Sequence, residues 1–145
     1  MTLRWWRAVT HLGDAATTIG AALLVMALGE ARLGMTMLLA NTTSHLSVQI
    51  LKRLVARPRP CDGSGRPLAL VALPDPFSFP SGHAAAVFAI ATPVALAHPS
   101  LVPVVMPPAV VVAWSRYRLR VHHPGDVLAG VALGLGGALL AYALL

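Results

Sequence analysis

Long apolar stretches, separated by short polar ones, run through most of this chain. They cover residues 15–29, 34–55, 82–97, 101–116 and 124–145. Each stretch is close to the roughly 20 residues that an α-helix needs to cross the hydrocarbon core of a bilayer. The pattern therefore predicts an all-α, polytopic membrane helix bundle with about five transmembrane helices. We expect it to form a single domain over residues 1–145.

The segment before the first apolar stretch, MTLRWWRAVTHLG, has a different character. Arg4 and Arg7 flank Trp5 and Trp6. Basic residues beside tryptophans are typical of an amphipathic helix that lies in the lipid headgroup layer. We therefore expect a short interfacial segment here, with a frayed tail as the alternative, and find no convincing signal-peptide cleavage motif.

The second apolar stretch carries a line of polar residues. Asn41, His45, Gln49 and Lys52 recur at helical spacing and so share one helical face. A polar stripe on a membrane-spanning helix is expected to face the interior of the bundle. We expect His45 to form interhelical hydrogen bonds rather than to take part in catalysis.

A proline-rich loop follows this helix. The sequence RPRP at residues 57–60 cannot continue a helix, because each proline disfavours helical geometry in the residue before it. Residues 61–80 are rich in proline and glycine and show no period. A connection of this length suits a lid over a substrate site as well as a plain linker, and the sequence favours neither.

The loop ends in FSFPSGH, residues 77–83, directly before the third apolar stretch. Ser81, Gly82 and His83 should therefore lie at a helix N-terminus, where free backbone N–H groups and the helix dipole attract anions. Histidine titrates near neutral pH and is suited to proton transfer. For these letters alone, a serine N-cap beside an incidental histidine explains the pattern equally well.

Composition and charge narrow the class of protein. The chain is 57% hydrophobic and only 11% charged, whereas a soluble domain has about 25% charged residues. The net charge of +6 does not indicate nucleic-acid binding, because no basic helix is interleaved with aromatic residues. A phosphate-bearing lipid is the better acidic partner. Cys61 is the only cysteine, so no intramolecular disulfide can form.

The glycines of the last stretch suggest how that helix packs. Gly130 and Gly134 form a small-xxx-small pair, with Gly137 nearby, which suits close helix packing. We expect this packing within the monomer rather than between two copies, so an oligomer is not indicated.

Three segments read together carry the chemistry. They are Lys52-x6-Arg59-Pro60, then Pro80-Ser81-Gly82-His83, then Ser115-Arg116-x5-His122-x3-Asp126. In these residues the chain resembles the type 2 phosphatidic acid phosphatase superfamily, membrane lipid phosphatases with an active site related to that of the vanadium haloperoxidases. All three motifs are complete, in order and correctly spaced, and the resemblance extends from the first apolar stretch to the C-terminus. Many members have six spanning helices, and here the first one has no counterpart.

The resemblance and the chemistry of the side chains imply the same roles. His122 attacks phosphorus and forms a phosphohistidine, and Asp126, four residues on, accepts its Nδ1–H and leaves Nε2 as the nucleophile. His83 protonates the leaving oxygen and then deprotonates the attacking water. The expected phosphate-binding residues are Lys52, Arg59, Ser81, Gly82 and Arg116.

Three cations at the phosphate can do the electrostatic work of Mg²⁺ in other phosphoryl-transfer sites, so we expect neither a metal nor another cofactor. A zinc site built from His83, His122, His123 and Asp126 is a less favoured alternative. The remaining basic residues near the motifs match no motif position, and we expect them to contact lipid headgroups; they are Arg53, Arg57, Arg66, Arg118 and Arg120.

The predicted function is hydrolysis of a lipid phosphomonoester or diphosphate by a multi-pass integral membrane protein, in the inner membrane of a bacterium. Candidate substrates are undecaprenyl diphosphate, which we favour, phosphatidate, phosphatidylglycerophosphate and lipid A phosphate. The alternative is a non-catalytic transporter or lipid-binding scaffold that keeps the phosphatase fold. Of the eleven Lys and Arg residues, only Arg32 is expected opposite the motifs. This bias favours a cytoplasmic site, whereas many bacterial relatives act on the outer leaflet.

Overall fold

A computed structural model describes residues 1–73 and 75–145. It contains six α-helices and two short 3-10 turns, η1 (His11–Gly13) and η2 (Pro99–Leu101). The helices are α1 (Leu3–Thr10), α2 (Ala15–Ala27), α3 (Ala31–Val55), α4 (Gly82–Ala97), α5 (Val102–Arg118) and α6 (Pro124–Leu144). In the described part of the chain, β structure is limited to isolated bridges. The all-α prediction is confirmed.

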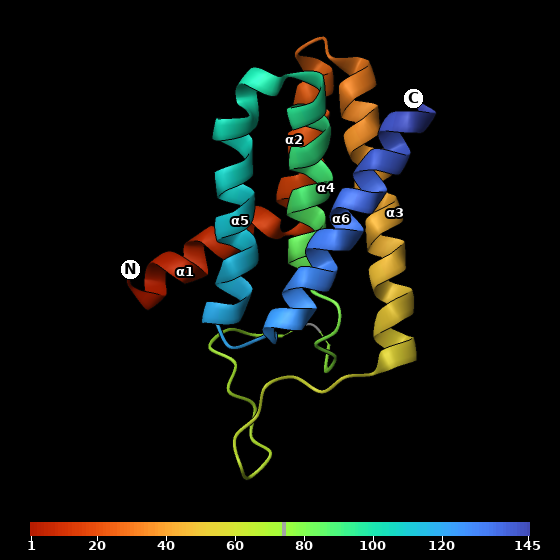
Figure 1. Cartoon of the computed structure of the whole chain (residues 1–145). Coiled ribbons are helices and arrows are strands. Elements are labelled where there is room, and N and C mark those ends of the chain that lie inside the picture. The colour runs from red at the N-terminus through yellow and green to blue at the C-terminus, as the bar shows by residue number, and fades with distance from the viewer. Residues whose placement is uncertain (74) are drawn as a thin grey trace.

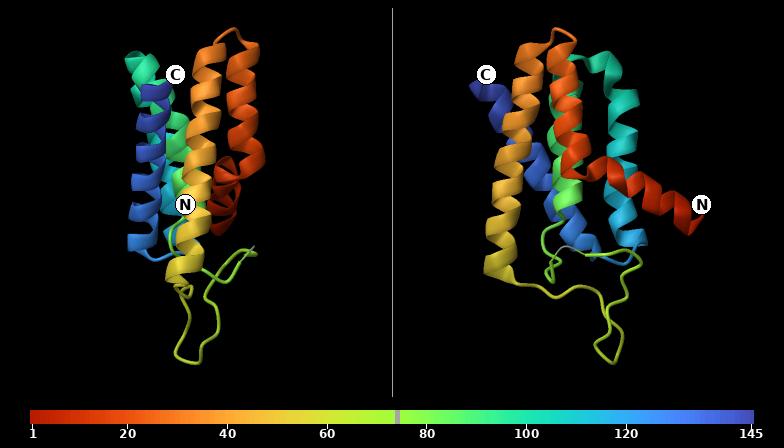
Figure 2. Two further views of the ribbon diagram at one scale, coloured as in Figure 1. Left: turned by 90° about the vertical axis from the view of Figure 1, so that its right-hand side faces the viewer. Right: turned by 180° about the vertical axis from the view of Figure 1, so that it is seen from behind.

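The helices stand side by side around α4, apart from α1, which lies across the bundle (Figures 1 and 2). Helix α4 packs against α6, α3 and α5. Ser81 caps its start, where the serine side chain accepts the N–H of Ala84, and His98 caps its end, just before Pro99. The main core is built on this helix: Ala84, Val87, Phe88, Ala91, Ala109, Val112, Ala113 and Val127.

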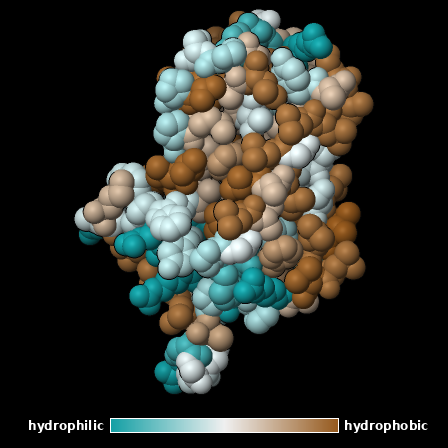
Figure 3. Space-filling view, in the orientation of Figure 1, coloured by the Kyte–Doolittle hydropathy of each residue, from teal (hydrophilic) through white to brown (hydrophobic). Residues whose placement is uncertain are grey.

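Large apolar side chains remain exposed around the helices, among them Leu23, Leu46, Val104 and Leu128. Figure 3 shows hydrophobic surface over the helical body and hydrophilic surface near the long loop. By length and hydropathy, α6 is the one described helix able to cross a membrane alone. Residues Leu3–Gly13 and Ala15–Ala27, bent by 53°, would together form a second span. Five spans therefore remain a prediction.

The glycines of α6 allow close packing inside the monomer. A Cβ at Gly130 would lie 3.0 Å from the Ala84 Cβ, and one at Gly134 would lie 2.8 Å from the Phe88 Cβ. Both glycines therefore face α4. Gly137 faces α3, where a Cβ would lie 3.0 Å from the Ala40 carbonyl oxygen. The small-residue face joins α6 to two neighbouring helices, as expected for packing within one chain.

Adding one methyl group on this face should destabilise the protein. At Gly134 it would overlap the Ala85 carbonyl oxygen, whereas at Gly136 nothing lies within 4 Å. We expect Gly134→Ala to cost about 1–3 kcal/mol of stability by overpacking, and Gly136→Ala to change it little. Thermal unfolding of the two variants in one detergent measures the difference. Equal melting temperatures would contradict the close packing of α6 on α4.

The N-terminal segment is helical, but it also packs on the protein. Trp6 is buried in a cluster with Leu119 and Val121. Arg7 donates two hydrogen bonds to the Leu70 carbonyl oxygen, at 3.1 and 2.7 Å. Helix α1 thus packs against both the end of α5 and the long loop. Its expected interfacial position in the bilayer remains a prediction.

The polar stripe on α3 is only partly buried. Asn41 donates a hydrogen bond to Thr18 Oγ1 of α2 at 3.3 Å, and Lys52 is buried. His45, however, is exposed and contacts Gln49 of its own helix. The expected interhelical role of His45 was therefore wrong. The buried face runs through Met37, Ala40, Ser44 and Val48, one residue away from the stripe that the polar spacing suggested.

Candidate active site

The three motifs meet at one end of the bundle. The end of α3, the start of α4, the end of α5 and the start of α6 all lie beside the long loop (Figure 1). Backbone hydrogen bonds connect the motifs. Ser81 N–H donates to the Asp126 carbonyl oxygen at 2.9 Å, and Arg59 Nη1 donates to the Val121 carbonyl oxygen at 2.9 Å. Residues far apart in the chain are thereby held in one cluster.

His122 is buried between the loop and α6, with 3% of its surface exposed. Its Nδ1 lies 2.5 Å from the Ser78 carbonyl oxygen. A carbonyl oxygen can only accept, so Nδ1 carries the proton and Nε2 keeps its lone pair. The sequence predicted Asp126 in this role, but Asp126 Oδ2 is 3.9 Å from Nδ1, too far for a hydrogen bond. The contact favours the expected tautomer, with the Ser78 oxygen rather than Asp126 as the acceptor.

Asp126 instead organises the turn that holds His122. Its Oδ2 accepts the backbone N–H of His123 at 2.8 Å and lies 3.1 Å from His123 Nδ1. Its Oδ1 pairs with Arg57 Nη1 at 2.9 Å. Arg57, expected to contact lipid headgroups, is therefore part of the site. The carboxylate caps α6 at its N-terminus, where a negative charge is favourable.

The charges around His122 favour its neutral form. Burial lowers the pKa of the imidazole below its ordinary value, and the nearby Arg116 and Arg59 cations lower it further, against the opposing effect of Asp126. A neutral imidazole is the form that can attack phosphorus.

His83 occupies the second position of α4 and faces the N-terminal turn. Its Nε2 lies 2.8 Å from Asp14 Oδ1. The other oxygen of Asp14, Oδ2, lies 2.7 Å from His11 Nδ1. Sequence reasoning assigned no role to Asp14.

The start of α4 offers donors to an anion. In the described chain, the backbone N–H groups of Gly82 and His83 have no acceptor. A Cβ at Gly82 would meet nothing closer than Val48 at 3.7 Å, so protein packing does not require glycine there. The Ser81 hydroxyl accepts the Ala84 N–H at 3.4 Å and keeps its own hydrogen for another acceptor. A helix start of this kind suits a phosphate group.

Arg116 is a buried cation with an unused donor. Only 4% of its surface is exposed, and its Nη1 donates to Thr10 Oγ1 at 2.6 Å. Its Nε is buried and has no partner among the described residues. An unsatisfied buried guanidinium N–H is costly, and a phosphate oxygen would satisfy it. Thr10, from the end of α1, also escaped the sequence analysis.

Lys52 and Arg59 share a carboxylate that the sequence did not indicate. Asp75 Oδ2 lies 2.6 Å from Lys52 Nζ, and Asp75 Oδ1 lies 3.1 Å from Arg59 Nη2. Arg59 Nε also donates to the Asp75 backbone oxygen at 2.9 Å. Partial burial acts to raise the pKa of Asp75, but Lys52 and Arg59 more than offset it and hold that pKa below its ordinary value. The Asp75 carboxylate is therefore bound to the two cations, Lys52 and Arg59, that we expect a phosphate to bind.

Removing the Asp75 charge should strengthen anion binding. Arg59 is also held by two backbone oxygens, those of Asp75 and Val121, so Asp75→Asn should leave it in place. We expect the inhibition constant of orthovanadate, an oxyanion of phosphate size, to fall about tenfold or less, because Asp75 is partly open to solvent and solvent weakens its hold on the cations. The matched control is Asp62→Asn, an exposed loop acid that contacts Ser64. Weaker inhibition of the Asp75 variant would show that the carboxylate orders the cations rather than competing for them.

A cavity of about 700 Å³ opens beside His83 and Arg116. Its remaining walls come from the N-terminal segment and residues 69–72 of the loop; they are Arg7, Thr10, His11, Asp14, Ala69, Leu70, Val71 and Ala72. The loop is therefore not a plain linker. It lines the cavity, carries Asp75 and supplies the Ser78 oxygen.

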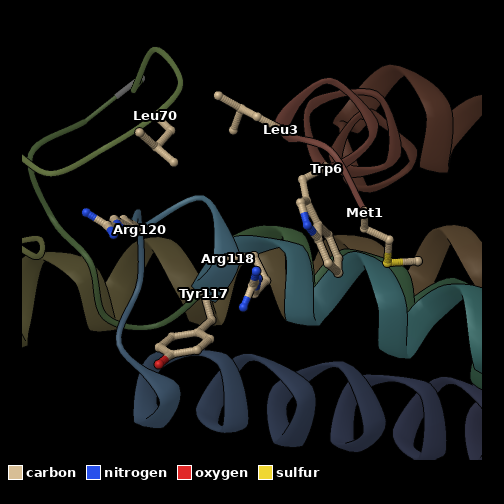
Figure 4. A pocket seen from close by; sticks show the side chains of 7 residues that line it. All are labelled: Met1, Leu3, Trp6, Leu70, Tyr117, Arg118 and Arg120. Atoms are coloured by element: carbon tan, nitrogen blue, oxygen red, sulfur yellow. The ribbon is translucent and has the colours of Figure 1, made fainter.

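A second hollow, of about 430 Å³ (Figure 4), shares Leu70 with the larger cavity. Figure 4 shows Trp6, Tyr117, Arg118 and Arg120 around it. Its walls contain none of the predicted catalytic residues, so the larger cavity is the candidate substrate site.

No group of three His, Cys, Asp or Glu side chains within residues 1–73 and 75–145 has a metal-binding arrangement. The zinc site considered as an alternative therefore has no supporting cluster among these residues. The polar contacts of His83 and Asp126 are instead made with protein groups.

The missed residues share a cause. Thr10, Asp14, Asp75 and Ser78 lie at or outside helix ends. Their contacts arise only when distant segments fold together. The one usable signal was local: of the chain's few acids, Asp14 directly precedes an apolar stretch, and Asp75 lies two residues before the FSFPSGH segment.

Comparison with known proteins places this geometry in a family. Residues 29–145 match the PAP2 superfamily. The decaprenylphosphoryl-5-phosphoribose phosphatases of two Mycobacterium tuberculosis strains, CDC 1551 / Oshkosh and H37Rv, are each 41% identical to this chain over 93 residues. The match covers 63% of this chain and 49% of each relative. The chain thus spans about half the length of these curated relatives.

Two solved structures have the same fold. A transmembrane PAP2-type phosphatidylglycerolphosphate phosphatase from Bacillus subtilis is 28% identical, with a TM-score of 0.76 over 97% of this chain and 75% of that one. Aquifex aeolicus LpxE is 22% identical, with a TM-score of 0.82 over 97% of this chain and 84% of that one. From its three motifs, its helical architecture and these matches, the chain belongs to the PAP2 superfamily.

Proposed function

We propose that this protein is a membrane lipid-phosphate phosphatase that works through a phosphohistidine intermediate. One observation carries the proposal: the buried His122 lies near the cations Arg116 and Arg59 and near donors that have no partner among the described residues. These include the unpartnered Nε of Arg116 and the free N–H groups of Gly82 and His83. Donors aimed at a developing negative charge are usually the largest source of rate enhancement.

The reaction takes place in two steps. His122 Nε2 attacks phosphorus, the bond between phosphorus and the ester oxygen breaks, and His83 gives that oxygen its proton. His83 then takes a proton from water as the water oxygen attacks phosphorus, the P–N bond breaks, and inorganic phosphate leaves. Lys52, Arg59 and Arg116, with Ser81 and Gly82, bind the non-bridging oxygens. Asp126 supports His122 through the turn that it caps, and no metal or other cofactor takes part.

The substrate is a phosphorylated lipid. Support comes from the apolar exposed surface of the helices and from the relatives, which act on a decaprenylphosphoryl ribose phosphate and a phosphatidylglycerol phosphate by their names. A phosphomonoester carried on a polyprenyl or glycerolipid chain is therefore the preferred substrate class. Undecaprenyl diphosphate remains a candidate substrate and represents the lipid diphosphates.

A phosphate-release assay tests the proposal. Purified protein in detergent is given decaprenylphosphoryl-5-phosphoribose, phosphatidylglycerophosphate, phosphatidate, lipid A phosphate and undecaprenyl diphosphate, with EDTA present. We expect release from at least one phosphomonoester and inhibition by vanadate as a transition-state mimic. No release from any substrate would favour the rival function, a non-catalytic transporter or scaffold. Activity only after addition of Zn²⁺ or Mg²⁺ would contradict the metal-free mechanism.

We further propose five spans with the site facing the cytoplasm. Lys and Arg gather near the motifs, while Arg32 lies at the far end of α3. In a Cys61→Ser background, an impermeant maleimide on intact cells should label Glu30→Cys and spare Ser64→Cys. Both positions are exposed. The opposite labelling pattern would place the site outside.

A further inference from the structure

The N-terminal turn brings a carboxylate to the expected general acid. Asp14 lies between η1 and α2, and its Oδ1 is 2.8 Å from His83 Nε2. His83 is partly buried, with 25% of its side chain exposed. Asp14 and His83 both line the candidate substrate cavity. Asp14 also precedes the region matched to the family, residues 29–145.

Both partners are held in place by packing. A Cβ at Gly13 would lie 3.0 Å from His83 Cδ2 and 3.0 Å from Val112 Cγ1, so the turn packs tightly against the ring, and a larger residue there would push against it. The other oxygen of Asp14 lies 2.7 Å from His11 Nδ1. The Asp14 carbonyl oxygen accepts the N–H and the hydroxyl of Thr18, at 3.0 and 3.1 Å. The carboxylate is thus fixed on both sides.

Asp14 is ionised at neutral pH. Partial burial acts to raise its pKa, but the hydrogen bonds and charges of His11 and His83 hold that pKa below its ordinary value. A carboxylate can only accept, so the His83 nitrogen that faces it, Nε2, carries a proton. The exchangeable proton of a protonated His83 is then the one on Nδ1.

We propose that Asp14 is a positioning residue for His83: it holds the Nε2–H, turns Nδ1 toward the leaving oxygen and stabilises the protonated ring. This inference rests on the proposed function, in which His83 is the general acid. In the first step the Nδ1 proton passes to the ester oxygen as its bond to phosphorus breaks. In the second step Nδ1 takes a proton from water.

The charges around His83 show what a carboxylate contributes there. His83 faces Arg116 from α5 and His122 from the turn before α6, in addition to Asp14. Asp14 faces His11 and His83, and Arg7 and Arg116 line the same cavity. The cations oppose protonation of His83. Among the described residues that line the cavity, Asp14 is the only acid.

The first test is Asp14→Asn, which keeps an acceptor oxygen but removes the charge. On a lipid phosphomonoester with an alkyl leaving group, we expect kcat to fall about 10- to 100-fold, part of the roughly 10²–10⁴ that general acid catalysis contributes. On p-nitrophenyl phosphate, whose leaving group needs little protonation, we expect kcat to fall by about threefold or less. The alkaline limb of the kcat/KM profile on the lipid should move to lower pH, because the protonated His83 is less stable.

Glu30→Gln is the matched control: it removes one carboxylate at the exposed α2–α3 connection, and it should change none of these quantities. A second variant, His83→Gln, tests whether Asp14 acts through His83. If it does, the double variant Asp14→Asn/His83→Gln should be as active as His83→Gln alone. Asp14 can have no effect through His83 once the His83 imidazole has been removed. Melting temperatures of all variants check the fold.

Two results would overturn the inference. One is an equal loss on lipid and aryl substrates with an unmoved pH limb, which indicates a merely structural role. The other is additive losses in the double variant. Failure of the proposed function is distinguishable, because the unaltered protein would then release phosphate from neither substrate.

Discussion

His122→Ala is expected to abolish turnover, with kcat/KM falling by about 10⁴-fold or more, the scale seen when a catalytic nucleophile is removed. The buried imidazole of His122, held by the Ser78 oxygen, is the nucleophile of the proposed mechanism. Phosphate release from a lipid phosphomonoester measures the loss. A phosphorus-labelled substrate should label the unaltered protein in an acid-labile, base-stable form and leave the variant unlabelled.

His123→Ala is the matched control for this experiment. His123 is the next residue in the same turn, is partly exposed, and contacts Asp126 through its Nδ1. Its backbone N–H, which Asp126 accepts, remains in the variant. We expect less than about a tenfold loss, the cost of one hydrogen bond. Undiminished activity of His122→Ala would end the phosphohistidine mechanism.

Helix positions were predictable from sequence where a local signal marked each end. The expected range 82–97 is that of α4, because Ser81 caps its start and His98-Pro99 ends it. The start of α6 at Pro124 follows the preference of proline for the first turn of a helix. The α3 start was missed by three residues, since Ala31, Arg32 and Leu33 form the first turn without a capping side chain.

The three motifs brought the expected residues to one place, but spacing alone did not give their contacts. His122 and Asp126 are four residues apart, yet the turn before α6 directs the carboxylate to His123 and Arg57. The acceptor for His122 is instead a loop carbonyl, Ser78. Every residue has a backbone carbonyl group, so the residue type at position 78 could not predict that this oxygen would be the acceptor.

Residues from outside the helices escaped for a related reason. Thr10 and Asp14 reach Arg116 and His83 because α1 and η1 pack on the end of α5. That contact depends on Trp6, Leu119 and Val121 and has no period in the sequence. The same holds for Asp75, which meets Lys52 only after the loop folds back under the bundle.

Arg116→Lys is expected to lower kcat/KM by about 10²- to 10³-fold, the cost of removing one donor from a developing oxyanion. The substitution keeps the positive charge. Lysine cannot present the planar fork of donors that lets arginine bind two phosphate oxygens. It also lacks the Nε–H that is buried without a partner in the described chain. Initial rates on a lipid phosphomonoester measure the loss, and the inhibition constant of orthovanadate should rise with it.

Arg118→Lys, two residues further along α5, is the control. Arg118 is exposed, and its guanidinium lies 5.8 Å from the centre of the Trp6 ring, outside the candidate substrate cavity. Its replacement should change kcat/KM by about threefold or less, because exposed charge contacts are weak. If both variants lose activity equally, the positive charge at this face matters and the geometry of the Arg116 donors does not. If only Arg116→Lys fails, and its vanadate inhibition weakens in parallel, the buried guanidinium is a phosphate ligand whose fork geometry the reaction requires.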